Sequence, residues 1–145
     1  MERPSPEPRA AYAHFLEIPT RWADNDVYGH VNNTVYYSYF DTVVNHYLIG
    51  AGALDPAAGE VIGLVVETHC GYFSELSFPD RVVAGLRVVH IGNSSVRYEI
   101  GLFRNEETTT SALGYFIHVY VDRLNRRPTA LPVPLRKAVE ALQLN

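Results

Sequence analysis

In the middle of the chain, apolar side chains recur in pairs every four residues. On a helix of 3.6 residues per turn these pairs form one broad stripe, as a buried helix requires. Asn32 and Asn33 precede the stripe and are good N-cap residues, whereas Gly50 and Gly52 follow it and favour a helix end. The apolar positions are Val35, Tyr36, Tyr39, Phe40, Val43, Val44, Tyr47 and Leu48. The pattern therefore predicts a long helix that ends near Gly50 or Gly52.

Elsewhere the hydrophobic period is two residues, which is typical of strands. Between His14 and Trp22 apolar and charged positions alternate, and Pro19 favours an edge or a bulge there because proline cannot donate to a ladder. Four more strands are expected at Val61–Phe73, Arg81–Ile91, Val96–Leu102 and Leu113–Val121. The last set places Leu113, Tyr115, Ile117, Val119 and Val121 on one face. Short turn signals between the late strands favour antiparallel pairing.

The order of these elements is one strand, one long helix, four strands and one short helix. The short helix is expected to begin at Pro134, which suits the first helical position, with an apolar stripe of Leu135, Val139 and Leu142. This order predicts an α+β domain in which a five-stranded antiparallel sheet covers one long central helix. We interpret residues 1–10 as a flexible tail and residues 11–145 as a single domain.

Composition narrows the class of protein. With 145 residues, 47% hydrophobic and 19% charged, the chain is long enough for a proper core and is not disordered, collagen-like or coiled-coil as a whole. Twelve basic and sixteen acidic residues give a net charge of −4, which argues against nucleic acid or an anionic membrane as the main partner. No apolar stretch is long enough to predict a membrane span or a signal peptide, so we expect a cytoplasmic protein.

Cysteine and histidine usage limits the chemistry. Cys70 is the one cysteine, which excludes a disulfide within the chain and a zinc site of several cysteines. The six histidines are scattered, and no spacing typical of metal ligands is present. We therefore predict no metal site.

The densest polar cluster of the sequence runs from Arg21 to Asn33, just before the long helix. A helix N-terminus has unpaired N–H groups and a partial positive charge, which suits a carbonyl oxygen that gains negative charge. An aspartate a few residues upstream, with Gly29 allowing a tight turn, can lie beside these donors. This layout is typical of acyl transfer. The alternative is structural: Asp24 and Asp26 as turn residues and Asn32 as the helix cap.

The motif Asp24-x-Asp26-x-x-Gly29-His30-Val31-Asn32-Asn33-x-x-Tyr36-x-x-x-Phe40 resembles the hotdog-fold thioesterases of the 4-hydroxybenzoyl-CoA thioesterase type. The resemblance extends roughly from His14 to Arg123, and includes the stretch Tyr72–Asp80. It implies a five-stranded antiparallel sheet wrapped around a long helix. It also implies subunits that join edge to edge into homodimers or homotetramers.

The resemblance also implies roles for individual residues. Asp26 matches the catalytic carboxylate of the family, and Asn33 falls where a backbone N–H meets the thioester carbonyl. His30 falls where many members carry a histidine, and Tyr36 matches a recurrent aromatic residue. His30 or Asn32 would orient the thioester or the attacking water.

Glu67 is a further candidate for substrate binding. It shares a strand face with His69 and can line a cleft that faces the partner subunit; the alternative is a polar edge residue. The predicted catalytic set is therefore Asp26, His30 and Asn33, and the predicted substrate-binding set is Asn32, Tyr36 and Glu67.

The leading hypothesis is an acyl-CoA thioesterase that releases a free acid and CoA. Asp26 would act as general base on water or as nucleophile through a mixed anhydride. No cofactor is expected, because CoA is part of the substrate. The alternatives are a thioesterase for acyl-carrier protein and a non-catalytic module that binds acyl-CoA.

Overall fold

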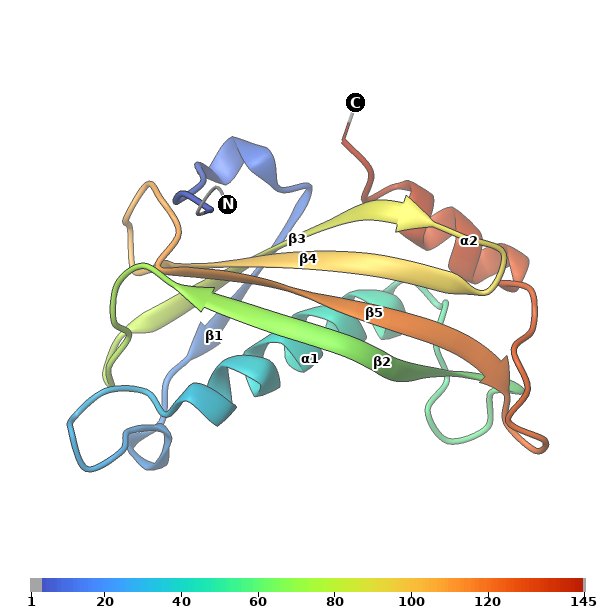
Figure 1. The fold of residues 1–145 in the computed structure, drawn as a ribbon, viewed down its shortest axis with the longest axis horizontal. Helices are drawn as coiled ribbons and strands as arrows, with labels where there is room; N and C mark the ends of the chain where they lie inside the picture. Colours follow the sequence, from blue (N-terminus) through green and yellow to red (C-terminus); the bar gives the residue numbers. More distant parts are fainter. Residues whose placement is uncertain (1–3, 145) are drawn as a thin grey trace.

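One antiparallel sheet with the strand order β1-β3-β4-β5-β2 forms the main layer of the fold (Figure 1). The structure, a computed structural model, describes residues 4–144. The strands are β1 (His14–Pro19), β2 (Val61–Tyr72), β3 (Arg81–Ile91), β4 (Ser95–Arg104) and β5 (Ala112–Asp122). All neighbouring strands run antiparallel, so the predicted five-stranded antiparallel sheet is confirmed.

The two edge strands differ in length and in exposure. β1 has six residues and ends at Pro19, which confirms the edge position predicted for this proline. The strand predicted between His14 and Trp22 is too long at its end, because Trp22–Asp24 form a 3-10 helix (η2). Hydrogen bonds between Arg21 and Asp24 stabilise this short helix. β2 has twelve residues, and residues 64–69 in its middle are exposed. The long edge of the sheet is therefore open.

Helix α1 (Asn33–Gly50) lies against one face of the sheet, and its bounds confirm the prediction (Figure 1). Its buried side chains are Tyr36, Tyr39, Phe40, Val43, Val44 and Leu48. The second helix, α2 (Val133–Glu140), begins one residue before Pro134, and Leu135 and Val139 are buried on it as predicted. The sheet is therefore accompanied by an 18-residue helix and an 8-residue helix rather than by one long helix alone.

The strands bury alternate positions against α1. In β4 these are Val96, Tyr98, Ile100 and Leu102, as the sequence pattern predicts. In β5 the more buried face carries Ala112, Gly114, Phe116, His118 and Tyr120. The apolar set beginning at Leu113 shares one face, as predicted, and this face is mostly the less buried one. The reason is that Phe40 of α1 packs beside Gly114 and Phe116, which fixes the face that β5 turns to the helix.

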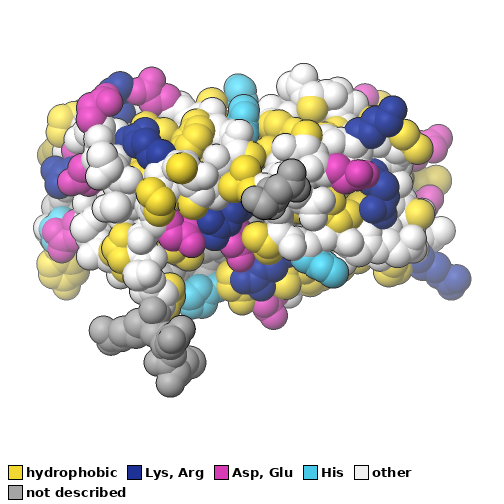
Figure 2. All heavy atoms as spheres, turned by 90° about the horizontal axis from the view of Figure 1, so that it is seen from above, with side chains coloured by type: hydrophobic (Ala, Val, Ile, Leu, Met, Phe, Trp, Pro, Cys, Tyr) yellow, Lys and Arg dark blue, Asp and Glu magenta, His cyan; other side chains and the backbone are white. Residues whose placement is uncertain are grey.

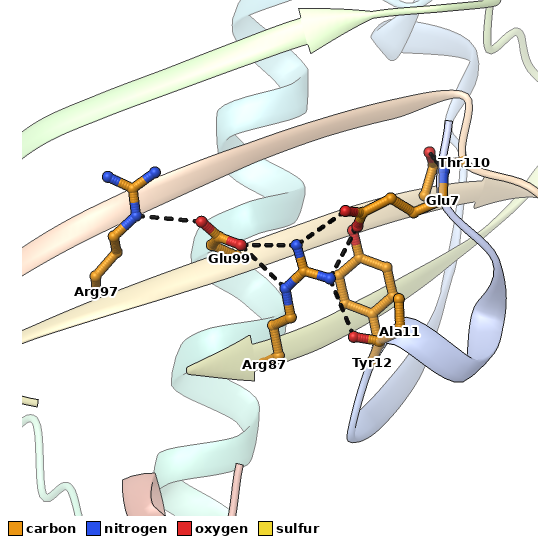
Figure 3. Close-up of polar contacts among 7 residues, drawn as sticks. All are labelled: Glu7, Ala11, Tyr12, Arg87, Arg97, Glu99 and Thr110. Atoms are coloured by element: carbon orange, nitrogen blue, oxygen red, sulfur yellow. Dashed lines mark hydrogen bonds and ion pairs between the residues drawn. The ribbon is translucent and has the colours of Figure 1, made fainter. Parts of the chain in front are cut away.

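The face of the sheet opposite α1 is partly covered by the N-terminal segment, residues 7–12 (Figure 3). The Tyr12 ring lies over Gly85 and Gly101, and its hydroxyl donates to Glu7 (2.8 Å). Glu7 pairs with Arg87 (2.9 Å), which also pairs with Glu99 (2.7 Å). Of the tail predicted to be flexible, residues 1–3 lie outside the described residues, and residues 7–10 belong to this contact.

Acidic, basic and apolar side chains are interspersed on the face drawn in Figure 2, which is seen from above relative to Figure 1. A mixture of signs produces no extended field of one sign on that face. Neither α1 nor α2 combines the length and the hydropathy that a bilayer-crossing helix needs, and this statement covers the described residues.

Candidate active site

The two aspartates of the loop between β1 and α1 have different environments. Asp24 is buried, and its carboxylate accepts hydrogen bonds from Arg21 and from the Tyr39 hydroxyl on α1 (2.8 Å). Burial opposes ionisation, but the bonds from the Arg21 backbone, the Tyr39 hydroxyl and the Arg21 guanidinium outweigh it, so the pKa of Asp24 is lowered. Asp24 therefore ties the loop to the helix.

Asp26 closes a tight turn and keeps one carboxylate oxygen available. Its Oδ1 accepts from the backbone N–H groups of Tyr28 (2.8 Å) and His30 (3.4 Å), and its own N–H donates to the His30 carbonyl (2.8 Å). Gly29 completes the turn with φ +83°, in the left-handed region that glycine enters without strain. Within the described residues no hydrogen bond reaches Oδ2 of Asp26, so this oxygen is open to a ligand.

The first turn of α1 offers a free donor. Asn32 caps the helix: its Oδ1 accepts from the backbone N–H of Thr34 (3.0 Å) and from the Thr34 hydroxyl (2.8 Å). The N–H of Asn32 itself donates to the Asp24 carbonyl (2.8 Å). The N–H of Asn33 meets no acceptor in the part of the chain that the structure describes. The helix dipole also favours negative charge at this position, so Asn33 can polarise a carbonyl group.

Asp26 and Asn33 both line one cavity of about 380 Å³. It lies between the loop after β1, the start of α1 and the segment that follows β2. His30 and Tyr36 line it as well. The predicted catalytic residues and one predicted substrate-binding residue are thus brought together at a single cavity.

Glu75 is a cavity residue that sequence reasoning missed. Its carboxylate Oε2 lies 2.8 Å from Nε2 of His30, and both side chains line the cavity. The next residue, Leu76, is fully buried, and its carbonyl accepts from the N–H of Val31 (2.8 Å), which holds the two loops together. The one signal for Glu75 was its place in the stretch Tyr72–Asp80, which belongs to the resemblance but carried no assigned role.

Two tyrosine rings form an aromatic wall of the cavity. Tyr36 on α1 and Tyr72 at the end of β2 meet edge to face, with ring centroids 4.8 Å apart. Burial raises the pKa of Tyr36, so its hydroxyl stays protonated at neutral pH. Burial also raises the pKa of the Cys70 thiol to about 11, and Cys70 is therefore no ready nucleophile. This aromatic wall suits an uncharged acyl group rather than a charged one.

Asn32 and Glu67 are not among the residues that line this cavity. The Asn32 side chain is engaged in capping α1. Glu67 lies on the sheet face opposite α1, where its carboxylate accepts from the Tyr115 hydroxyl (2.8 Å). A substrate contact for either residue stays a prediction.

Among residues 4–144 no group of three or more His, Cys, Asp or Glu side chains is arranged to hold a metal ion.

Residues 20–139 match the family model of the thioesterase-like superfamily. A search of curated proteins gives no significant match. Among solved structures, the PA5185 protein from Pseudomonas aeruginosa strain PAO1 is 53% identical with a TM-score of 0.94, over 96% of this chain and 97% of that one.

Two further solved structures have functional names. A thioesterase from Thermus thermophilus, complexed with coenzyme A and Zn, is 28% identical with a TM-score of 0.75, over 91% of this chain and 95% of that one. A 1,4-dihydroxy-2-naphthoyl-CoA thioesterase from Synechocystis is 18% identical with a TM-score of 0.78, over 86% of this chain and 93% of that one. At this identity the second likeness shows the fold alone.

Proposed function

The chain belongs to the thioesterase-like superfamily and has its hotdog fold, and from this premise we propose that it hydrolyses acyl-CoA thioesters to a free acid and CoA. The observation that carries the proposal is the cavity that Asp26 and the start of α1 share. The CoA bound in the Thermus thermophilus relative supports a CoA ester as the substrate.

In the proposed reaction the thioester carbonyl oxygen accepts a hydrogen bond from the N–H of Asn33. As the carbon is attacked this oxygen becomes negative, and one well-placed donor of this kind is worth about 3 kcal/mol in the transition state. The helix dipole of α1 adds to the same stabilisation. A thioester needs no stronger activation, because its carbonyl has little resonance stabilisation and a thiolate is a tolerable leaving group.

Asp26 supplies the attack by one of two routes. Its Oδ2 takes a proton from a water molecule whose oxygen adds to the carbonyl carbon, or Oδ2 adds itself and forms a mixed anhydride that water then hydrolyses. In both routes the C–S bond breaks, a C–O bond forms, and CoA leaves as a thiolate that takes up a proton. His30, held by Glu75, orients the thioester or the water.

We predict that Asp26→Asn lowers kcat by about a hundredfold or more, since a positioned carboxylate base contributes at least that much. Asn keeps an acceptor oxygen for the turn, so the fold is preserved. The measurement is release of free thiol from a panel of aliphatic and aromatic acyl-CoA esters.

Asp55→Asn is the matched control. Asp55 closes a loop in the same way, accepting from the N–H groups of Ala57 and Ala58 (3.1 Å each), but at the far end of α1. Full activity of the Asp26 variant would remove this carboxylate from the chemistry. After a single turnover in ¹⁸O-labelled water, label in the Asp26 carboxylate identifies the anhydride route, because the general-base route leaves both Asp26 oxygens in place.

Two alternatives are outcomes of the same experiments. If matched acyl-carrier protein is hydrolysed much faster than acyl-CoA, the carrier protein is the substrate. If calorimetry detects acyl-CoA binding and no thiol is released, the chain is a non-catalytic binding module.

A homodimer joined through the two β2 edges is the second part of the proposal. β2 is the longest strand, lies at the edge of the sheet and exposes Leu64, Val65 and Val66. An open edge of this length with apolar side chains favours pairing with another strand. A second copy offers the same edge, and a two-fold axis makes the pairing self-complementary. A homotetramer would add a further interface, and the mass in solution distinguishes the two.

A further inference from the structure

A second cavity, of about 200 Å³, lies at the opposite end of α1 from the candidate active site. It is enclosed by the C-terminal half of α1, the loop before β2, the start of β2 and the end of β5. Most of its wall is apolar, including Leu48, Leu54 and Ile62. Two polar side chains, Asn45 and His118, also line it. No step of the proposed hydrolysis uses this cavity within one subunit.

His118 is unusual for a cavity residue because it is 94% buried and lacks a partner. Its exposed fraction is 6%; Nε2 is sealed inside the protein without a hydrogen bond, and among the described residues no hydrogen bond reaches Nδ1 either. The ring is held between Phe116, on which it stacks, and Tyr98, which meets it edge to face. Its Nδ1 side lies against Gly63, since a Cβ built on Gly63 would come within 3.2 Å of Nδ1.

Burial lowers the pKa of His118 to about 4, so the imidazole is neutral at neutral pH. A neutral imidazole offers one acceptor nitrogen and one N–H donor. Neighbouring polar groups are satisfied: the hydroxyls of Tyr98 and Tyr120 bond to each other (2.6 Å). Because Nε2 is sealed, Nδ1, which lies beside the cavity residue Gly63, is the nitrogen that a ligand in the cavity would reach, and a buried polar side chain without a partner is unusual. The cavity therefore suits a mainly apolar ligand that carries one neutral hydrogen-bonding group.

A β-bulge in β2 determines which residues of the strand face α1, and therefore where this cavity lies relative to a second subunit paired through β2. The pairing of β2 with β5 shifts between Val65 and Glu67. As a result the residues that face α1 are odd-numbered at the start of β2, as in Gly63, and even-numbered at its end, as in Cys70 and Tyr72.

In an antiparallel pair, directly opposed residues share a face. The register that pairs all of β2 places Tyr72 opposite Val61 of the partner subunit, and Cys70 opposite Gly63 of the partner subunit. Helix-facing residues then meet helix-facing residues at both ends. Since strands are about 4.8 Å apart, β5 of the partner subunit, with its His118, lies about 10 Å from β2. The second cavity of one subunit therefore lies on the same face as the Tyr72 wall of the other subunit and farther along the strand: Gly63 comes opposite Cys70, and His118, which pairs with Val65, comes level with Thr68.

We propose that this cavity receives the far end of an acyl group whose thioester is bound in the other subunit, and that His118 selects acyl groups with a neutral hydroxyl at that end. The inference rests on the proposed hydrolysis and on the β2–β2 pair. The proposed substrate class is acyl chains that are apolar along their length and carry an uncharged hydroxyl group at the far end. His118 is a specificity-determining residue in this scheme and takes no part in the chemistry at Asp26.

The test compares matched CoA esters of straight-chain acids with and without a terminal hydroxyl group, over a series of chain lengths. At the chain lengths that reach the partner's cavity, kcat/KM is expected to be higher for the hydroxylated ester than for the plain ester. At the shortest length the two esters are expected to have the same kcat/KM. In His118→Phe, which keeps the aromatic stack, this preference falls by about five- to tenfold, the usual size of one hydrogen bond. Hydrolysis of the shortest ester is unchanged in the same variant.

Three results overturn the proposal. The first is hydrolysis of the whole series with no preference for the hydroxyl, and the second is a preference that survives His118→Phe. Both leave the proposed hydrolysis standing. The third is an absence of thiol release with every ester. This result contradicts the proposed function as well, and the complete lack of thiol release distinguishes it from the other two.

If His118→Phe does not fold, a measurement on the wild-type protein still tests the proposal. The ¹⁵N signals of His118 are recorded with a non-hydrolysable thioether of CoA that carries a long hydroxylated chain, and with its matched alkyl thioether. A change in the His118 signals with the first probe and not with the second supports the proposal. Equal or absent changes with both probes contradict it.

Discussion

Glu75 supplies neither a donor nor a nucleophile to the acyl group, but it fixes the ring of His30 beside the cavity. The contact between its carboxylate and Nε2 of His30 measures 2.8 Å. An imidazole held by a carboxylate keeps one orientation and one tautomer, a common way to position a histidine for catalysis. We therefore treat Glu75 as a positioning residue in the proposed reaction.

Glu75→Gln is expected to lower kcat about three- to tenfold with little change in KM, because the substrate still binds while His30 is oriented less well. Steady-state kinetics with the best acyl-CoA ester give both values. Glu106→Gln, at an exposed glutamate paired with Arg81, is the control and should behave like wild type. An unchanged kcat in the Glu75 variant, alongside a large loss in His30→Asn, would exclude the positioning role.

Asp24 affects stability rather than catalysis. Its pKa is lowered in the folded chain, so the unfolded chain binds the proton more tightly. The resulting stabilisation is complete above the ordinary pKa of an aspartate and is lost as the pH falls through the lowered value.

Asp24→Asn should reduce the free energy of unfolding by about 2 kcal/mol at neutral pH, because it weakens the charge-assisted hydrogen bonds that the buried carboxylate accepts from Arg21 and Tyr39. The difference from wild type should shrink as the pH falls below the ordinary pKa of an aspartate, because protonation of Asp24 removes the charge that the Asn variant lacks. Urea unfolding at several pH values measures it. A difference that stays constant with pH would mean that the charge of Asp24 is not what stabilises the loop.

At the scale of elements, the N-terminal segment stabilises the sheet from the side away from the candidate active site. Tyr12 is 5% exposed, meets Phe103 edge to face and lies under the guanidinium of Arg87. Arg87 in turn links Glu7 on the segment to Glu99 on β4 (Figure 3). The segment is therefore held by both packing and charge.

Tyr12→Ala should lower the free energy of unfolding by about 3 kcal/mol, as expected for removal of a buried aromatic ring. kcat/KM should remain at the wild-type value, because the ring lies on the face opposite α1. Tyr12→Phe separates the two contributions: it keeps the ring, loses the bond to Glu7 and should cost about 1 kcal/mol. Loss of activity in a variant that stays folded would contradict this division between the two faces.

How far the sequence predicted each element depends on where its signals lie. α1 was predicted to within a residue because its cap Asn32, its stripe and its end are all local. Which face of β5 is buried did not follow from its apolar alternation, because that choice depends on Phe40, more than seventy residues away. Glu75 was missed for the same reason, since only the folded chain brings it to His30. Asp26 and Asn33 could be placed together because the turn that joins them is short.

At the scale of the whole molecule, the open edge of β2 is where the proposed homodimer forms. Val66 is 60% exposed and is the residue that the bulge of β2 leaves without a partner in β5. A lysine there would place two charges close together at the centre of a β2–β2 pair, which disfavours pairing.

Val66→Lys should convert a dimer into a monomer, measured by sedimentation, and should reduce hydrolysis of long acyl esters more than that of short ones. Val89→Lys is the matched control. Val89 is also an exposed valine at a β-bulge, but it lies in β3, within the sheet. An unchanged mass for the Val66 variant, or a monomeric wild-type protein, would exclude the edge-to-edge pair.

The ring of Tyr12 also makes two positions of the sheet informative for relatives of unknown structure. A Cβ built on Gly85 would lie 2.8 Å from the Tyr12 ring, and one built on Gly101 would overlap it. A bulky residue at either aligned position is incompatible with an aromatic ring at this site. Such a relative must route its N-terminus elsewhere, and that face of its sheet is left free for another subunit.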